Sequence, residues 1–203
     1  FNICVFISFN LYFCKMKTIA IFASGNGTNA QNICNHFKYS KEIKVVLLCT
    51  NKKKSTVVSR LKKYSVPSFI FSKEELNNSN LVIEKLKIFK VDYIILAGFL
   101  LKIPKSIIDL FENQIINIHP SLLPKYGGRG MYGENVHRNV IENKEKESGV
   151  SVHFINNNYD EGVIIQQEKC LLCEDETVSS LTEKIRFLEH KYFPAIIEKI
   201  ITK

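Results

Sequence analysis

An asparagine and a histidine stand two positions apart at residues 117 and 119, directly after an apolar pair and directly before a proline. Alternate side chains of an extended segment share one face, so Asn117 and His119 should point the same way. Pro120 disfavours helix at His119 and ends regular strand pairing. An amide beside an imidazole suits a reaction in which a carbonyl oxygen becomes negative and protons move. Taken alone, such a pair is more often the satisfied polar edge of a sheet.

A carboxylate that could orient this imidazole stands in the polar turn at residues 156–162. Imidazole changes its charge near neutral pH, and a neighbouring carboxylate tunes that change. Asp160 is the candidate in this turn, and Glu161 is its neighbour. A turn of this composition is also typical of a simple connection between strands. Asn117, His119 and Asp160 together are the candidate catalytic residues.

A glycine-containing loop, Ser-Gly-Asn-Gly-Thr-Asn-Ala at residues 24–30, lies between an apolar run and a helical pattern. Glycine permits a tight turn, and free amides at the start of a helix attract an anion. The loop fits the G-x-G-x-x-A pattern of dinucleotide sites, but residues 50–54 lack the acid that would bind the ribose. A dinucleotide is therefore disfavoured unless it carries a 2′-phosphate. Two interpretations of the loop remain: it binds a single phosphate group, or it is a purely structural turn.

Short apolar runs alternate with helical patterns, which predicts a doubly wound α/β fold with a mostly parallel twisted sheet flanked by helices. The predicted strands are 18–23, 44–49, 68–71, 91–97, 115–119, 150–155 and 163–167. The predicted helices are 29–37, 56–64, 74–89, 105–111, 136–142 and 178–200. Ser72 and Glu75 fit a capping box. The short connection between the last two strands predicts antiparallel pairing in the C-terminal half, and Pro194 should kink or break the last helix.

The stretch Asn-Ile-His-Pro-Ser-Leu-Leu-Pro at residues 117–124 resembles the folate-dependent formyltransferases, and the likeness extends from about Lys17 to Ile201. The resemblance implies the formyltransferase fold and transfer of a formyl group from 10-formyltetrahydrofolate to the amine of 5′-phosphoribosylglycinamide in purine biosynthesis. It implies that Asn117, His119 and Asp160 are catalytic, with Asp160 paired to His119. Neither a metal nor a protein nucleophile is required.

The resemblance also implies the binding residues. The phosphate of the acceptor would be held by backbone amides at Gly27, Thr28 and Asn29. Glu189 would bind the ribose hydroxyls of the acceptor, and Arg186 would also contact the phosphate. From spacing alone, Arg186 and Glu189 form a surface ion pair. The implied folate contacts are Lys73, Leu100, Leu101, Lys102, Ile103, Asn117, Asn156, Asn157, Asn158, Tyr159 and Asp160. Lys73 stands where many relatives carry Arg, and it lacks the bidentate fork of that residue.

Three further polar features receive no catalytic role. His153 lies in the middle of a predicted strand and is interpreted as a structural histidine. His137 starts a predicted helix and could reach the site. The glycine-rich loop at residues 126–133 is a hypothetical lid over the substrate, without an assigned function.

The composition is that of an ordinary globular protein, with 45% hydrophobic and 24% charged residues among 203. The net charge of +8 favours an anionic partner. Residues Lys52–Lys54 are expected to be a solvated surface, since no nucleic-acid motif accompanies them. Cys170 and Cys173 form a lone C-x-x-C without further zinc ligands. We expect reduced thiols, a cytoplasmic protein without membrane or nucleic-acid partners, and a monomer or homodimer.

Residues 1–15 are apolar and aromatic but too short for an ordinary membrane span, and they lack a cleavage site. Met16 precedes the first predicted strand, so we expect residues 1–15 to be a non-native extension; a cryptic membrane anchor is the alternative. Residues 16–203 should form one domain, with a phosphate-binding Rossmann-like half at 16–115 and a catalytic and folate-binding half at 116–203.

Four other functions compete with this interpretation. Formyltransferases that act on methionyl-tRNA have an additional C-terminal domain, which we do not expect here. Formyltetrahydrofolate hydrolases carry a regulatory domain ahead of the catalytic one, which we also do not expect. A non-catalytic nucleotide-binding module would use only residues 25–29 and leave Asn117, His119 and Asp160 unexplained. A basic nucleic-acid binder would need a strongly salt-dependent affinity.

Overall fold

The structure is a computed structural model that describes residues 16–203. The expectation for residues 1–15 lies outside the described residues. Along the chain the elements are β1 (Lys17–Phe22), α1 (Thr28–His36), β2 (Ile43–Thr50), α2 (Thr56–Leu61), the 3₁₀ turn η1 (Lys62–Tyr64), β3 (Ser68–Ile70), α3 (Lys73–Asn78), α4 (Asn80–Ile88), β4 (Tyr93–Leu96), α5 (Lys105–Leu110), β5 (Ile115–His119), α6 (Glu134–Glu142), β6 (Glu147–Phe154), β7 (Ile164–Leu171) and α7 (Val178–Ile201).

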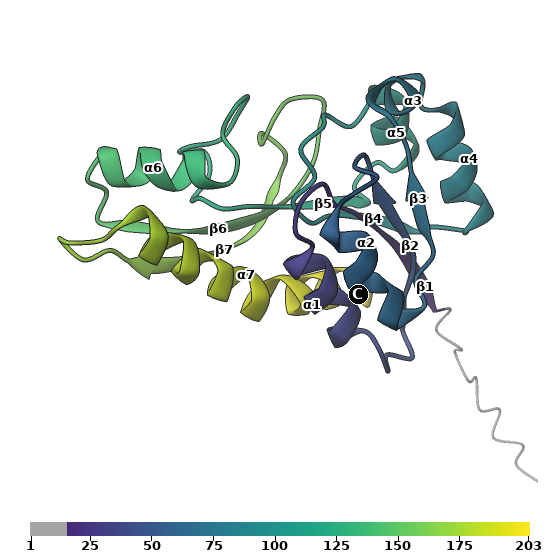
Figure 1. Ribbon diagram of the computed structural model, residues 1–203, viewed down its shortest axis with the longest axis horizontal. Coiled ribbons are helices and arrows are strands. Elements are labelled where there is room, and N and C mark those ends of the chain that lie inside the picture. The colour runs from purple at the N-terminus through teal and green to yellow at the C-terminus, as the bar shows by residue number, and fades with distance from the viewer. Residues whose placement is uncertain (1–15) are drawn as a thin grey trace, which may run out of the picture.

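The strands form one seven-stranded sheet in the order β3-β2-β1-β4-β5-β6-β7. Strands β1 to β5 are parallel, while β6 pairs antiparallel with β5 and with β7. Helices connect the parallel strands, as right-handed crossovers require. The predicted doubly wound sheet with antiparallel strands in the C-terminal half is confirmed (Figure 1).

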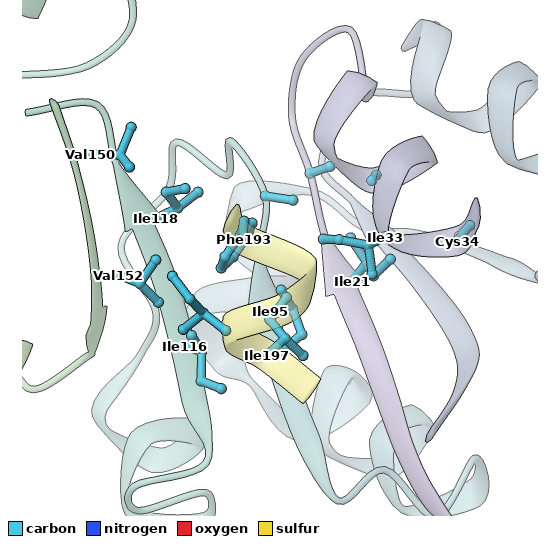
Figure 2. Packing of buried hydrophobic residues seen from close by; sticks show 14 of the residues in the cluster. Ile21, Ile33, Cys34, Ile95, Ile116, Ile118, Val150, Val152, Phe193 and Ile197 are labelled. Carbon is cyan, nitrogen blue, oxygen red and sulfur yellow. The ribbon is translucent and has the colours of Figure 1, made fainter. Parts of the chain in front are cut away.

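Two apolar cores cover the two faces of the sheet, because successive strand side chains point to opposite sides. Ile19 and Ile21 of β1 enter one core, together with buried residues of α1, α2, α6 and α7. Ala20 and Phe22 enter the other core, together with buried residues of α3, α4 and α5. In Figure 2, Phe193 of α7 lies among strand residues of the first core. The result is a three-layer α/β/α arrangement.

The predicted helix at 74–89 is two helices, α3 and α4, which meet at Ser79. Ser79 has φ 58°, a left-handed conformation that cannot continue an α-helix. Its hydroxyl group is buried and lies 2.7 Å from the hydroxyl of Ser106 in α5. The predicted capping box is confirmed, since Ser72 and Glu75 exchange side-chain and backbone hydrogen bonds at the start of α3.

Of the two expectations for Pro194, a kink or a break, the break is wrong, because α7 continues from Val178 to Ile201. Proline has no N–H to donate to the carbonyl four residues earlier, which is that of His190. Asn32 of α1 supplies the missing donor, with its Nδ2 at 2.6 Å from the His190 oxygen. The side chain of a neighbouring helix therefore satisfies the carbonyl that the proline leaves free.

The parallel strands direct their carboxyl ends to one edge of the sheet, and the loops that follow β1, β4 and β5 meet there. Ligands of open α/β sheets bind at this edge. Among residues 16–203, no helix combines the length and the apolar character needed to cross a bilayer.

Candidate active site

A cavity of about 700 Å³ opens at this edge of the sheet. It is lined by segments of the chain that are far apart in sequence: the glycine loop after β1, the segment after β4, the end of β5, the glycine-rich loop at 128–133, His137 of α6, the turn between β6 and β7, and one side of α7. The sequence-predicted site residues that line it are Thr28, Asn29, Leu100, Leu101, Lys102, Ile103, Asn117, His119, Asn156, Asn158, Tyr159, Asp160, Arg186 and Glu189.

The predicted catalytic side chains lie at the floor of this cavity. Asn117 and His119 are both on β5, which spans the predicted residues 115–119. Asp160 has φ 56° in the turn after β6, and its Oδ1 lies 3.6 Å from His119 Nδ1. Its second oxygen, Oδ2, accepts a hydrogen bond from the Gly128 amide at 2.9 Å. The glycine-rich loop thus holds the carboxylate that faces the imidazole.

Both ring nitrogens of His119 face oxygen atoms. Nε2 lies 2.7 Å from the carbonyl oxygen of Tyr126, which can only accept, so Nε2 carries a hydrogen. Nδ1 faces the carboxylate of Asp160. The distance of 3.6 Å from Nδ1 to Asp160 Oδ1 is longer than a hydrogen bond, so the carboxylate faces the ring as a nearby negative charge. The imidazole is buried, with 4% of its residue surface exposed.

A second histidine, His153 of β6, holds the amide of Asn117. His153 Nδ1 donates to the Phe154 carbonyl at 2.8 Å, and Nε2 lies 3.0 Å from Asn117 Nδ2. Burial lowers the pKa of His153 and so favours the neutral ring, whose Nε2 accepts from the amide. One hydrogen of Asn117 Nδ2 is then bound, which leaves the other to be donated into the cavity. The sequence predicted a structural histidine at position 153 and did not reveal this contact.

We expect His153→Leu to lower kcat about 10- to 100-fold, because the Asn117 amide loses the acceptor that orients it. His153→Gln should retain more activity, since the amide oxygen of glutamine can accept from Asn117. Steady-state kcat and KM of both variants measure the effect. Equal kcat values for the leucine and glutamine variants would contradict a positioning role for His153.

His137 of α6 also reaches the cavity, as its position at a predicted helix start allowed, and it has no assigned role. It is 4% exposed, and its Nδ1 is buried with no hydrogen-bond partner among the described residues. Burial lowers the pKa of His137, and the nearby His119 lowers it further. His137 is thus a neutral imidazole beside a site where His119 faces a carboxylate.

The lowered pKa of His137 makes stability depend on pH. Below the unfolded pKa of about 6.5 the unfolded chain binds a proton that the folded protein resists, so this contribution is lost as pH falls. We expect the free energy of unfolding of wild type, relative to His137→Leu, to decrease between pH 7 and pH 5. Urea denaturation across this range measures it. The comparison cancels the raised pKa of Glu189, which acts in the opposite direction; an unchanged difference between the two proteins would refute the prediction.

The glycine loop leads into the first turn of α1. Gly27 has φ 75°, and a Cβ there would lie 2.4 Å from the Val57 side chain, so only glycine fits. The Gly27 backbone does not line the cavity, whereas Thr28 and Asn29 do. Free amides at this helix start can bind an anion.

Asn29 and Glu189 connect the glycine loop with α7. Asn29 Nδ2 donates to Glu189 Oε2 at 2.8 Å, while Asn29 Oδ1 is buried without a partner among the described residues. Burial raises the pKa of Glu189. Arg186 lies on the same side of α7 and also lines the cavity. The predicted surface ion pair between Arg186 and Glu189 is absent among the ion pairs of residues 16–203.

The apolar side of the cavity comes from the segment after β4. Gly98 turns this segment with φ 74°, and the Leu100 amide donates to Ser24 Oγ at 3.1 Å. Lys102 Nζ lies 5.3 Å from the centre of the Tyr159 ring, which ties this segment to the turn that carries Asp160. A flat ring with polar edges could stack here between leucine side chains and exposed peptide groups.

Two predicted folate contacts lie outside this cavity. Asn157 lines a second, shallower cavity of about 530 Å³ beside Lys102 and Ile103. Lys73, in the first turn of α3, lines neither cavity. No cluster of three or more potential metal ligands occurs among residues 16–203. The four cysteines of that range are unpaired thiols: Cys34, Cys49, Cys170 and Cys173.

The site therefore combines four capabilities. It has an amide donor for a developing oxyanion, an imidazole with a carboxylate for proton movement, a helix start for an anion, and an apolar slot for a flat ring. This combination suits transfer of an acyl group between two bound molecules without a covalent enzyme intermediate.

Comparisons with known proteins agree with this chemistry. The family described as "Formyl transferase" matches residues 17–197. The phosphoribosylglycinamide formyltransferase of Bacillus subtilis is 32% identical over 191 residues, covering 92% of this chain and 95% of that protein. The chloroplastic enzyme of the same name from Arabidopsis thaliana is 34% identical over 92% of this chain, which spans 66% of that protein's length.

Solved structures give the same result. The crystal structure of phosphoribosylglycinamide formyltransferase from Bacillus halodurans superimposes with a TM-score of 0.84 at 33% identity, covering 92% of this chain and 96% of that one. The family match begins at residue 17 and ends in α7, so it includes the glycine loop, β5 and most of the closing helix. The chain belongs to the formyl transferase family.

Proposed function

We propose that this protein transfers the formyl group of 10-formyltetrahydrofolate to the amine of 5′-phosphoribosylglycinamide, a step of purine biosynthesis. One observation carries the proposal: Asn117, His119 and Asp160 meet in a cavity that lies between an anion-binding loop and an apolar slot. The names of the Bacillus subtilis and Arabidopsis thaliana relatives support the same acceptor.

The two substrates enter from opposite sides of the cavity. The phosphate of the acceptor binds the amides of Gly27, Thr28 and Asn29, with Arg186 beside it and Glu189 at the ribose hydroxyls. The folate ring lies along residues 100–103 and the turn at 156–160. This arrangement follows the predicted halves, with the phosphate loop in 16–115 and the proton-transfer residues in 116–203. Lys73 is left as an outer contact of the folate.

In the reaction, the acceptor amine attacks the formyl carbon and a tetrahedral oxyanion forms. The free Nδ2 hydrogen of Asn117 and the imidazolium of His119 stabilise this oxyanion. The amine loses one proton, and the folate nitrogen gains one as its bond to the formyl carbon breaks, so the overall reaction needs no added proton. Asp160 holds the imidazole in position and stabilises its positive charge.

Both substrates are small molecules, so neither nucleic acid nor membrane is a required partner. A cytoplasmic location is proposed for this chain, while the name of the Arabidopsis thaliana relative describes that protein as chloroplastic. A monomer already contains every residue of the site.

Absorbance of the folate product measures the reaction directly when the purified protein is mixed with 10-formyltetrahydrofolate and glycinamide ribonucleotide. We expect turnover only when the acceptor is present. Loss of the formyl group without acceptor would indicate a hydrolase instead. A folded protein that binds the acceptor but gives no turnover would refute the proposed reaction.

A further inference from the structure

The net positive charge of this protein resides in one segment. Residues 43–73 contain eight basic residues and no acidic one. The chain has 28 Lys and Arg residues and 20 Asp and Glu residues, so the remainder holds 20 of each and is neutral. The eight are Lys44, Lys52, Lys53, Lys54, Arg60, Lys62, Lys63 and Lys73. An uneven distribution of this kind creates a local field that scattered charges would not.

The topology places the centre of this segment beside the glycine loop. Strand β2 is the direct neighbour of β1 and is parallel to it, so the turns after both strands lie at the same edge of the sheet. The turn after β2 contains Lys52, Lys53 and Lys54. Lys44, near the start of β2, lies at the opposite edge. The lysine triplet, residues 52–54, therefore flanks the proposed phosphate site.

Hydrogen bonds fix both ends of this turn to the glycine loop. On one side, Ser24 Oγ donates to Asn51 Oδ1 at 2.7 Å. On the other side, Ser55 Oγ donates to the Gly25 carbonyl at 2.7 Å, and Thr56 Oγ1 donates to that of Asn26 at 3.2 Å. Each lysine is at most two residues from Asn51 or Ser55, so its Cα lies within about 8 Å of a residue bonded to the loop. That distance is comparable to the Debye length of about 8 Å at physiological ionic strength.

The triplet is not neutralised by neighbouring carboxylates. All three lysines are exposed, and none takes part in an ion pair found among residues 16–203. The next basic residue, Arg60 of α2, donates to Gln31 of α1 at 3.1 Å rather than to an acid. The positive charge of Arg60 therefore adds to that of the triplet beside α1 and α2. Asp160 and Glu189 line the cavity together with Lys102, Arg129 and Arg186, and the triplet adds positive charge from outside it.

We propose that the lysine triplet is an anion-collecting surface, which draws the phosphomonoester of the acceptor to the glycine loop. This inference rests on the proposed function, because it concerns the same phosphate site. Positive charge beside a binding cleft raises the local concentration of an anionic substrate and its rate of association, by 10- to 1,000-fold in well-developed cases. The triplet contributes to capture of the acceptor and not to the chemical step.

The test compares two triple variants with the same loss of charge. Lys52→Gln, Lys53→Gln and Lys54→Gln together remove the triplet. Lys41→Gln, Lys44→Gln and Lys87→Gln together remove three exposed lysines that line neither cavity. We expect the first variant to lower kcat/KM for glycinamide ribonucleotide about tenfold at low salt, with kcat at saturating acceptor retained. At about 1 M salt, where the Debye length is about 3 Å, the difference from wild type should vanish.

The control variant should behave as wild type at both salt concentrations. If the two variants lose kcat/KM equally, net charge and not the triplet attracts the acceptor, and the inference is wrong. It is equally wrong if the triplet variant keeps the wild-type kcat/KM and salt dependence.

Calorimetric titration with glycinamide ribonucleotide, without folate, separates this inference from the proposed reaction. Wild type should bind the acceptor more tightly than the triplet variant at low salt and equally at high salt. If wild type binds the acceptor but does not turn it over, the proposed reaction fails while the titration still decides the inference. If wild type does not bind the acceptor at all, both are wrong.

Discussion

His119→Ala should lower kcat for formyl transfer by about 100- to 10,000-fold, while the KM for the phosphorylated acceptor stays near its wild-type value. The imidazole faces Asp160 at Nδ1 and the Tyr126 carbonyl at Nε2, and His153 Nε2 lies 3.7 Å from the same Asp160 oxygen. His153 is held by Phe154 and Asn117, and the pKa of His137 is lowered by burial. The proposed phosphate site at the glycine loop lies elsewhere in the cavity, so the affinity for the acceptor should not change. Folate absorbance at saturating substrates measures kcat.

The matched control for this variant is His36→Ala. His36 ends α1 and pairs with Glu198, away from the cavity, so its removal should leave kcat unchanged. Thermal melting establishes that both variants are folded. Added imidazole should restore part of the activity of His119→Ala, because the deleted ring leaves a space that imidazole can fill. A wild-type kcat in His119→Ala would exclude this residue from the reaction.

Gly162→Ala should destabilise the protein by about 2–5 kcal/mol and reduce the activity of the remaining folded molecules. A Cβ at this position would lie 1.8 Å from the Phe154 carbonyl oxygen and 2.7 Å from its carbon, so the backbone must move. That carbonyl accepts the Nδ1 hydrogen of His153, and the Phe154 amide donates to Val163 across the same hairpin at 2.9 Å. The displaced hairpin also carries Asp160 away from His119.

Urea denaturation measures the loss of stability, and Gly25→Ala is the steric control. A Cβ at Gly25 would meet no atom within 4 Å, so the same change there should alter the free energy of unfolding little. Equal urea midpoints for Gly162→Ala and Gly25→Ala would contradict this prediction, because they would show that the hairpin accommodates the added Cβ without a loss of stability.

Periodicity and residue type predicted most of the fold. The strand at 115–119 agrees with β5 at both ends, because an apolar run ends there at a proline. The starts of β3, α2, α5 and α7 and the end of α6 also agree. The remaining ends are off by one to four residues, as for β7, where polar residues such as Lys169 and Glu168 on an edge strand hide the pattern. The break at Ser79 was missed because Leu76, Val82 and Leu86 all belong to one core, so the apolar pattern continues across it.

The site was partly predictable for a different reason. Asn117, His119 and Asp160 were found because a strand end and a turn are visible in sequence and the resemblance links them. The contacts of His153 with Asn117 depend on the register between β5 and β6, in which Asn117 stands opposite His153. No local pattern specifies that register. The position of His137 at the cavity likewise depends on how α6 packs beside the sheet, which no local sequence pattern specifies.

The proline in α7 has a consequence for how two walls of the cavity respond to mutation. The carbonyl of His190 in α7, which Pro194 leaves free, accepts a hydrogen bond from Asn32 of α1. The first turn of α1 follows the glycine loop, and α7 carries Glu189. Asn32→Ala alone would leave a carbonyl without a partner, whereas Pro194→Ala restores an N–H that can bond the same oxygen. The two substitutions should therefore be non-additive, with the second one compensating for the first. The proline within α7 thus makes a hydrogen bond from the neighbouring helix α1 necessary for the stability of α7.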